Sequence, residues 1–237
     1  MIPLQENNVH IWSANLQITT EQEQAGFANL SEDEQQRANR FLSPEHRRRF
    51  IAARSTLRDI LSFYLQIAPK EILFAYSEHH KPHLQFPANT DIQFNISHSH
   101  DLAVYAITLK HQIGIDIEKI ENHYNPAVAA RYLSHEESTF LNTLPEDQRA
   151  EGFYVFWSYK EALIKAVGKG LSLPLSSFTL SLTNTLQIIS LNKETWQLIP
   201  LALFPGYASA LASNQTIKNC YLCSIVEHKP QFSKLPI

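Results

Sequence analysis

The chain has 237 residues, of which 44% are hydrophobic and 11% aromatic, so it can form one large domain or two small ones with a substantial core. The net charge of −3 excludes a general nucleic-acid-binding protein, which needs a strongly basic surface. The first residues show no signal peptide and no apolar run is long enough to span a membrane, so we expect a cytoplasmic protein without a membrane partner.

The first quarter of the chain predicts one strand followed by two helices. Residues 9–18 favour an opening strand, and residues 30–41 favour a helix rich in Glu, Gln and Arg. Ser43 begins a longer helix that runs to about residue 66, because a serine N-cap followed by Pro44 at the first helical position is a strong start signal.

Three arginines of this longer helix share one face. Arg47, Arg54 and Arg58 follow one another at steps of seven and four residues, which places them on a single stripe. The planar guanidinium group suits phosphate oxygens. For Arg47 and Arg58, a solvated basic surface is an equal alternative to phosphate binding.

The middle of the chain predicts a sheet and then further helices. Short strands with tight connections are expected at residues 92–99, 102–109 and 113–120. Their short turns favour an antiparallel meander. A helix begins at Ser134 and a long helix follows near Phe153, whereas strands and turns are expected from Leu173 onward. The last residues, with Pro230, favour a loose tail.

The third strand carries two acids on one face. Isoleucines alternate with Gly114, Asp116 and Glu118, so the isoleucines face a core and the two carboxylates point the same way, about 7 Å apart. Like charges at this separation repel unless a cation lies between them, and a hard divalent ion is the natural occupant. Gly114 would let a ligand approach the backbone. A solvated strand face is the alternative.

The long C-terminal helix also places charge where packing favours apolar groups. Trp157, Glu161 and Lys165 recur every four residues and therefore share a stripe. Lys160 lies about 100° round the helix and is either solvated or functional. Gly168 supplies a left-handed stop. The apolar stripe consists of Phe156, Tyr159, Leu163 and Ala166.

Two cysteines, Cys220 and Cys223, form a Cys-x-x-Cys pattern, which raises the question of a metal or redox site. The surrounding residues favour a strand, on which residues three apart face opposite sides. We therefore expect buried structural cysteines.

Three segments in this order resemble the 4′-phosphopantetheinyl transferases: residues 94–99 (FNISHS), 113–118 (IGIDIE) and 156–171 (FWSYKEALIKAVGKGL). The type resembled is the large, pseudo-dimeric one that activates peptide and polyketide synthases. The resemblance covers about residues 30 to 182.

The resemblance implies an α+β fold of two similar halves about a pseudo-twofold axis, with a coenzyme A cleft between them. We place the halves at residues 1–112 and 113–237. A short internal echo agrees with this division, because residues 40–45 (RFLSPE) are similar to residues 131–136 (RYLSHE).

The resemblance also implies an activity. The enzyme would transfer the 4′-phosphopantetheine group of coenzyme A to a serine of an apo carrier protein and release 3′,5′-ADP. It would use Mg²⁺, with Mn²⁺ as an alternative, and act as a monomer. The carrier, whether acyl, peptidyl or polyketide type, is left open. The alternatives are another magnesium-dependent phosphodiesterase and a non-catalytic module that binds coenzyme A or a carrier.

Roles for individual residues follow from the family's motifs. The metal-binding acids would be Asp116, Glu118 and Glu161, and the catalytic lysine would be Lys165. The base that accepts the serine proton is Glu161, Glu137 or a metal-bound water. Glu137 has a structural alternative, because Ser134-x-x-Glu137 is a capping box.

The implied contacts with coenzyme A are Arg54, Lys81, Ser97, His98 and, on the diphosphate, Lys165. Arg37 stands near one phosphate-binding lysine of the family. This sequence departs from the pattern at Glu34, which occupies the place of another such lysine. Phosphate contacts from this region are therefore in doubt.

Overall fold

A computed structural model describes residues 2–181, 186–191, 193–226 and 229–236. The first half contains β1 (Asn8–Asn15), α1 (Thr20–Ala28), α2 (Glu32–Asn39), α3 (Pro44–Leu65), β2 (Leu73–Tyr76), β3 (Pro82–Phe86), β4 (Ile92–Ser99) and β5 (Leu102–Leu109). The second half contains β6 (Ile113–Lys119), α4 (Pro126–Tyr132), α5 (His135–Thr143), α6 (Glu146–Val167), β7 (Gln187–Leu191), β8 (Glu194–Pro200), β9 (Tyr207–Ser213), β10 (Asn219–Val226) and β11 (Lys229–Leu235).

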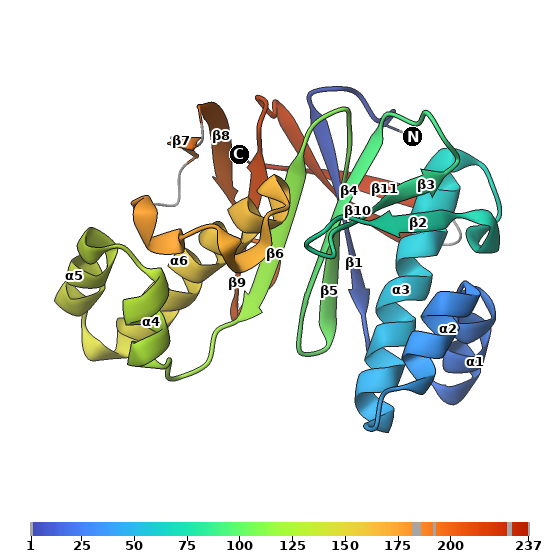
Figure 1. The fold of residues 1–237 in the computed structure, drawn as a ribbon, viewed down its shortest axis with the longest axis horizontal. Helices are drawn as coiled ribbons and strands as arrows, with labels where there is room; N and C mark the ends of the chain where they lie inside the picture. The colour runs from blue at the N-terminus through green and yellow to red at the C-terminus, as the bar shows by residue number, and fades with distance from the viewer. Residues whose placement is uncertain (1, 182–185, 192, 227–228, 237) are drawn as a thin grey trace.

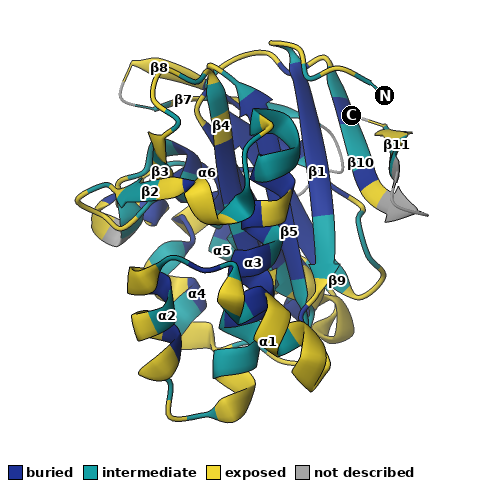
Figure 2. Cartoon of the chain, turned by 90° about the vertical axis from the view of Figure 1, so that its right-hand side faces the viewer, coloured by how far each residue is buried: buried dark blue, intermediate teal, exposed yellow. Residues whose placement is uncertain are grey.

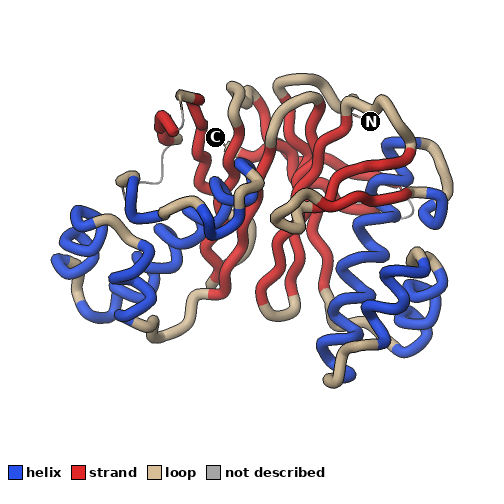
Figure 3. The backbone as a smooth tube through the Cα atoms, in the orientation of Figure 1, coloured by secondary structure: helices blue, strands red, loops and turns tan. Residues whose placement is uncertain are grey.

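The strands form two central sheets with helices on either flank (Figures 1 and 3). The first sheet has the order β11-β10-β1-β5-β4 and the second has the order β6-β9-β8-β7. The hairpin of β2 and β3 forms a separate two-stranded sheet. Among the described residues, no helix is long and apolar enough to cross a membrane.

The two halves repeat one arrangement. In the first half, β1 pairs antiparallel with β5 and β5 with β4, and the 22-residue helix α3 packs on this sheet. In the second half, β6 pairs antiparallel with β9 and β9 with β8, and the 22-residue helix α6 packs on that sheet. The predicted α+β fold of two similar halves is therefore confirmed.

Strand alternation divides the core into layers. Odd-numbered residues of β1 and β6, such as Val9 and Ile115, pack between the two sheets. Even-numbered residues of the same strands point toward the helices, as Trp12 does toward α3. Figure 2 shows the buried strands β1 and β5 beside the exposed outer faces of α1 and α2. Cys220 and Cys223 are buried on opposite faces of β10, as predicted.

Several sequence predictions need correction. Helix α1 was not expected, because its apolar residues show little periodicity. The expected meander ends after β5, since β6 pairs with β9 in the other sheet. The expected loose tail contains strand β11, which pairs with β10. Helix α6 begins seven residues earlier than residue 153, at Glu146.

The division at residues 112 and 113 stays a prediction, and the sheet topology crosses it. Strand β10 lies beyond residue 113 in the sequence, yet it pairs in parallel with β1 of the first half.

Candidate active site

The two sheets meet where the edge strand β4 runs beside the edge strand β6. Main-chain N–H groups of β6 donate to side chains of β4 rather than to its backbone. The pairs are Ile115 N to Asn95 Oδ1 at 2.9 Å, Ile117 N to Ser97 Oγ at 3.4 Å and Lys119 N to Ser99 Oγ at 3.0 Å. We call this row of contacts the seam.

The seam brings together residues of all three sequence motifs. Lys165 Nζ of α6 donates to Asp116 Oδ1 at 2.6 Å and lies 2.7 Å from Ser97 Oγ. Ser97 Oγ also lies 2.8 Å from Asp116 Oδ1. Asp116 is 1% exposed, whereas the Lys165 side chain is 27% exposed, so Lys165 is the most exposed member of this trio.

Two further carboxylates lie beside this trio. Ser99 Oγ donates to Glu118 Oε2 at 3.1 Å. Burial, reinforced by the negative charge of Asp116, raises the pKa of Glu118 to about 7. Burial also raises the pKa of Glu161; Lys165 offsets part of that rise and Asp116 adds to it. The predicted convergence of Asp116 and Glu118 on one face is confirmed.

The three carboxylates are suitable ligands for a divalent cation, but they are not arranged around a common point. Asp116 Oδ2 is buried and has no hydrogen-bond partner within the described ranges, and burial raises the pKa values of Glu118 and Glu161. Among the described residues, however, no group of three or more His, Cys, Asp or Glu side chains is arranged to hold a metal ion. Binding one would have to draw the three carboxylates together.

Gly114 serves a different purpose from the one predicted. A Cβ atom at this position would lie 2.0 Å from Ala162 O and 2.4 Å from Ala166 N. The glycine therefore admits the backbone of α6 against β6, rather than a ligand. This close approach carries Lys165, the neighbour of Ala166, to Asp116.

A pocket of about 500 Å³ opens on the other side of β4. Its lining is basic and aromatic and includes no acid: Leu16, Arg37, Phe41, His46, Arg49, Phe50, Ala53, Arg54, Ile96, His98 and His100. Because side chains alternate along a strand, Ser97 points to the seam while His98 lines the pocket. Burial lowers the pKa of His98, and the charges of Lys165 and Arg49 lower it further.

Two predicted residues make contacts that hold the fold together. Both oxygens of Glu137 are engaged: Oε2 accepts from Ser134 N at 2.7 Å and from Lys160 Nζ at 2.8 Å, and Oε1 accepts from Leu180 N at 2.8 Å. Lys160 is fully buried, so it is neither solvated nor open to a ligand. These contacts favour the capping-box interpretation of Glu137.

Lys81 is also engaged by the protein itself. Its ammonium group donates to Ala166 O at 2.9 Å and to Ile113 O at 3.2 Å, which ties the β2–β3 hairpin to the end of α6. Burial lowers the pKa of Lys81 to about 8. Lys81 does not line the basic pocket.

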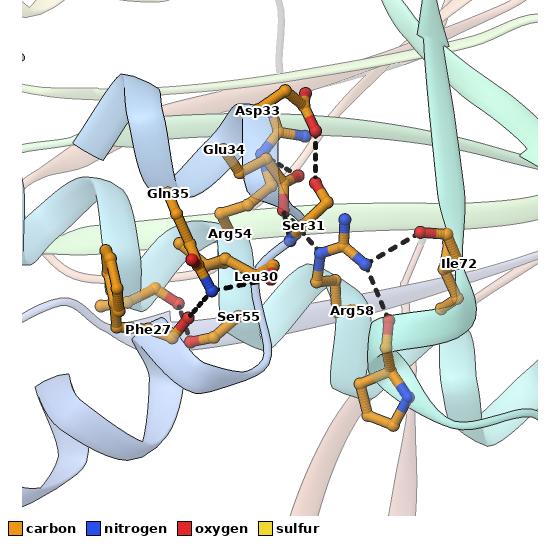
Figure 4. Close-up of polar contacts among 12 residues, drawn as sticks. Phe27, Leu30, Ser31, Asp33, Glu34, Gln35, Arg54, Ser55, Arg58 and Ile72 are labelled. Atoms are coloured by element: carbon orange, nitrogen blue, oxygen red, sulfur yellow. Dashed lines mark hydrogen bonds and ion pairs between the residues drawn. The ribbon is translucent and has the colours of Figure 1, made fainter. Parts of the chain in front are cut away.

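Each arginine of the α3 stripe forms an ion pair with an acid of α1 or α2. Arg47 pairs with Glu23 of α1, and Arg58 is fully buried against Glu34 of α2, with Nε 2.6 Å from Oε2 (Figure 4). Arg54 also pairs with Glu34, at 3.3 Å between Nε and Oε1, and it lines the pocket. The acid that departs from the family pattern therefore pairs with two arginines.

Some site residues were missed at the level of sequence. Asn95 and Ser99 accept hydrogen bonds across the seam, and Arg49 lines the pocket. The alternation of Asn95, Ser97 and Ser99 along β4 is a signal that could have identified the polar face of this strand.

Two family models match the chain. The one described as "4'-phosphopantetheinyl transferase superfamily" matches residues 112–212, and the one described as "4'-phosphopantetheinyl transferase, N-terminal" matches residues 15–110.

Individual relatives agree with these matches. The chain is 37% identical over 214 residues to 4'-phosphopantetheinyl transferase HetI from Nostoc sp., across 89% of this chain and 90% of that protein. It is 39% identical over 165 residues to 4'-phosphopantetheinyl transferase Sfp from Bacillus subtilis, across 65% and 72%. It is 32% identical over 188 residues to 4'-phosphopantetheinyl transferase gsp from Aneurinibacillus migulanus, across 78% and 77%. The chain therefore belongs to the 4′-phosphopantetheinyl transferase superfamily.

Proposed function

We propose that this protein transfers the 4′-phosphopantetheine group of coenzyme A to the serine hydroxyl of an apo carrier protein, at the seam between its two halves. The observation that carries the proposal is the adjacency of two sites along β4. Ser97 belongs to the trio with Asp116 and Lys165, and the next residue, His98, lines the acid-free basic pocket. A diphosphate bridge attached to a phosphorylated nucleoside could occupy both sites together.

The pocket suits the nucleoside end of the donor. Arg37, Arg49 and Arg54 supply positive charge for a 3′-phosphate, and the rings of Phe41 and Phe50 supply apolar surface for a base. Burial lowers the pKa of His98, which favours its neutral imidazole as a hydrogen-bonding group while no anion is bound in the pocket.

The seam suits the reacting end. The serine oxygen would attack the phosphorus that carries the pantetheine arm, and the bond from that phosphorus to the oxygen of 3′,5′-ADP would break. Lys165 would stabilise the departing oxygen, because it carries the positive charge of the trio and its side chain is the most exposed of the three. A magnesium ion held by Asp116, Glu118 and Glu161 would neutralise part of the diphosphate charge.

Glu161 is the better candidate for the base. Its carboxyl group interacts electrostatically with both Lys165 and Asp116, which puts it at the reacting end of the site. The contacts of Glu137 support a structural role instead, since both of its oxygens are bonded within the fold. The phosphate role of Lys81, the monomeric state, the cytoplasmic location and the choice of carrier stay predictions.

The test is a mass measurement on the carrier. The protein is incubated with coenzyme A, Mg²⁺ and an apo carrier protein, and we expect the carrier to gain the mass of one phosphopantetheine arm. Hydrolysed coenzyme A without a carrier gain would favour a phosphodiesterase, and bound but intact coenzyme A would favour a non-catalytic module.

Matched variants locate the site. Asp116→Ala and Lys165→Ala should abolish transfer, whereas Lys169→Ala, an exposed lysine one turn further on, should retain it. Calorimetric titration with Mg²⁺ alone tests the metal proposal independently of activity, since binding should weaken in Asp116→Ala. Full activity in Lys165→Ala would remove the role assigned to that residue.

A further inference from the structure

Arg54 is held from two sides by residues that have no assigned role. Its Nε forms an ion pair with Glu34 Oε1 of α2 at 3.3 Å (Figure 4). Its Nη2 donates to Tyr76 Oη of β2 at 3.3 Å. The ring of Phe74 lies 5.4 Å from the guanidinium carbon. Two edges of the guanidinium fork are therefore engaged by the protein.

The third nitrogen is left over. Arg54 Nη1 is buried and has no hydrogen-bond partner in the part of the chain that the structure describes. A buried charged donor without an acceptor is costly, so such a group is expected to find a partner. Arg58 also has an unpartnered nitrogen, Nη2, but Arg58 is fully buried and does not line the pocket. Because Arg54 lines the pocket and Arg58 does not, an anion in the pocket would lie beside the side chain of Arg54.

Comparison of two glutamates shows what is special about Glu34. Glu34 and Glu137 each use Oε2 to close a capping box and to bind a buried cation of the long helix. The other oxygen of Glu137 accepts from Leu180 N. The other oxygen of Glu34 accepts no hydrogen bond among the described residues and faces Arg54 instead. The structural device needs one oxygen, so the second oxygen of Glu34 is available to orient Arg54.

The remaining arginines of the pocket are less directed toward a ligand. Arg49 is shared between Glu45 and Asp101, at 2.7 Å from each. Arg37 is exposed and its guanidinium carbon lies 5.2 Å from the ring centre of Phe50. Of these three arginines, Arg54 is therefore the one that has a buried, unpartnered nitrogen and a side chain held in place by the protein.

We propose that Glu34 and Tyr76 are positioning residues that hold Arg54 with Nη1 free for the 3′-phosphate of the donor. By fixing this edge, they set the preference of the pocket for nucleotides that carry a 3′-phosphate. The proposal rests on the proposed function, which places coenzyme A in this pocket. It also explains why an acid is tolerated at position 34 of a phosphate-binding region.

The test compares the binding of 3′,5′-ADP with that of 5′-AMP, since the two differ only in the 3′-phosphate. Isothermal titration calorimetry gives the dissociation constant of each nucleotide without any need for catalysis. The quantity compared is the dissociation constant of 5′-AMP divided by that of 3′,5′-ADP, which measures the preference for a 3′-phosphate. In Tyr76→Phe, which removes only the hydroxyl group, we expect this ratio to fall about three- to tenfold. Affinity for 5′-AMP should not change. The KM for coenzyme A should rise while kcat is retained.

Two further variants separate positioning from general stability. Tyr105→Phe is the matched control, because Tyr105 Oη donates to Ala53 O at 2.9 Å, next to Arg54 but not on its side chain. It should leave the ratio unchanged. Glu34→Gln combined with Arg58→Met removes the buried charge pair without stranding Arg58, and it should lower the ratio as Tyr76→Phe does.

The outcomes distinguish two kinds of failure. A wild-type protein that prefers 3′,5′-ADP, with Tyr76→Phe and the double variant showing the same preference, would overturn the positioning role alone. An equal fall in Tyr105→Phe would also overturn it, because the effect would then be general. A wild-type protein without any preference would overturn both this role and the assignment of coenzyme A to the pocket.

Discussion

In each half of the molecule the first strand packs against a long helix, but the side chains at this contact are large and aromatic in one half and small or charged in the other. Where β1 meets α3, His10 Nδ1 lies 2.7 Å from Tyr64 Oη and Trp12 Nε1 donates to the same oxygen at 2.9 Å. Where β6 meets α6, the corresponding strand positions hold Gly114 and Asp116. Gly114 packs on Ala166, which, like Tyr64, is the last but one residue of its helix.

The consequence is a core in one half and a reactive site in the other. Bulky aromatic groups fill the contact of α3 with β1, and their polar atoms bond to one another. Glycine and alanine instead let α6 come close along β6, so that Lys165 reaches Asp116. One architecture therefore supports packing or chemistry, depending on side-chain size at a few positions.

The halves also share a feature that is structural in both. Arg58 of α3 and Lys160 of α6 both lie seven residues before the end of their helices, and both are fully buried. Each pairs with the capping-box glutamate of a short helix, Glu34 or Glu137, and each donates to two main-chain carbonyls. Because the first half carries no catalytic acid of this kind, the equivalence supports a structural role for Glu137.

The largest expected effect is on activity, and it should differ between equivalent positions of the two long helices. Asp59 of α3 and Glu161 of α6 occupy the same helix position, six residues before the end. Glu161→Gln should reduce kcat by about 100-fold or more, because it removes the proposed base. Asp59→Asn should stay within about twofold of wild type in the same carrier mass assay. Similar rates for the two variants would remove the asymmetry that we assign.

The two buried ion pairs, Arg58–Glu34 and Lys160–Glu137, should both contribute to stability. Lys160→Met should lower the free energy of unfolding by about 3 to 5 kcal/mol, because it strands the buried Glu137. Arg58→Met should lower it by less, because Glu34 keeps its ion pair with Arg54. Urea denaturation measures this. Glu137→Gln together with Lys160→Met should recover much of the loss and keep kcat within a few-fold of wild type. A thousandfold loss of kcat in this stable double variant would restore Glu137 as a catalytic residue.

The close approach of α6 to β6 can be tested with a single methyl group. Gly114→Ala should lower the free energy of unfolding by about 3 kcal/mol and reduce transfer, because the Cβ would collide with the backbone of α6. Gly26→Ala is the comparison in the first half, where the Cβ would meet Ser55 Oγ at 2.9 Å and the better helix propensity offsets the contact. It should change stability by less than about 1 kcal/mol. An equal loss of stability in the two variants would contradict the view that the close backbone contact of α6 makes Gly114 necessary.

The smallest expected effect is the pH dependence of stability that His10 causes, at the aromatic contact of β1 with α3. Burial lowers the pKa of His10 to about 4, so between about pH 6.5 and 4 the folded protein binds fewer protons here than the unfolded chain. Stability should therefore fall by about 2 to 3 kcal/mol as pH falls through this range.

Other groups also titrate in this range, so the measurement is the difference between wild type and His10→Phe. The surroundings of His10 are aromatic, with Tyr64, Tyr221 and Phe232 against its ring, and they accept a phenyl group. The pH dependence of unfolding in urea should be shallower in the variant. Parallel curves would show that His10 does not contribute.

Local signals determined much of this protein from its sequence alone. The cap at Ser43, the left-handed stop at Gly168 and the alternation around Asp116 each depend on neighbours along the chain, and each is confirmed. The motifs that identify the family are also contiguous. Periodicity correctly placed the acids on one face and the isoleucines in a core, because strand geometry fixes which side each residue occupies.

Tertiary structure alone decided which charged residues are free to act. Lys160 and Lys165 lie five residues apart on α6, yet one is bonded at 2.8 Å to Glu137 and the other meets Asp116. Gly114 admits a helix rather than a ligand, and Glu34 pairs with two arginines of another helix. Burial, pKa and partnership arise from segments distant in sequence, so only the packed chain separates a structural charge from a reactive one.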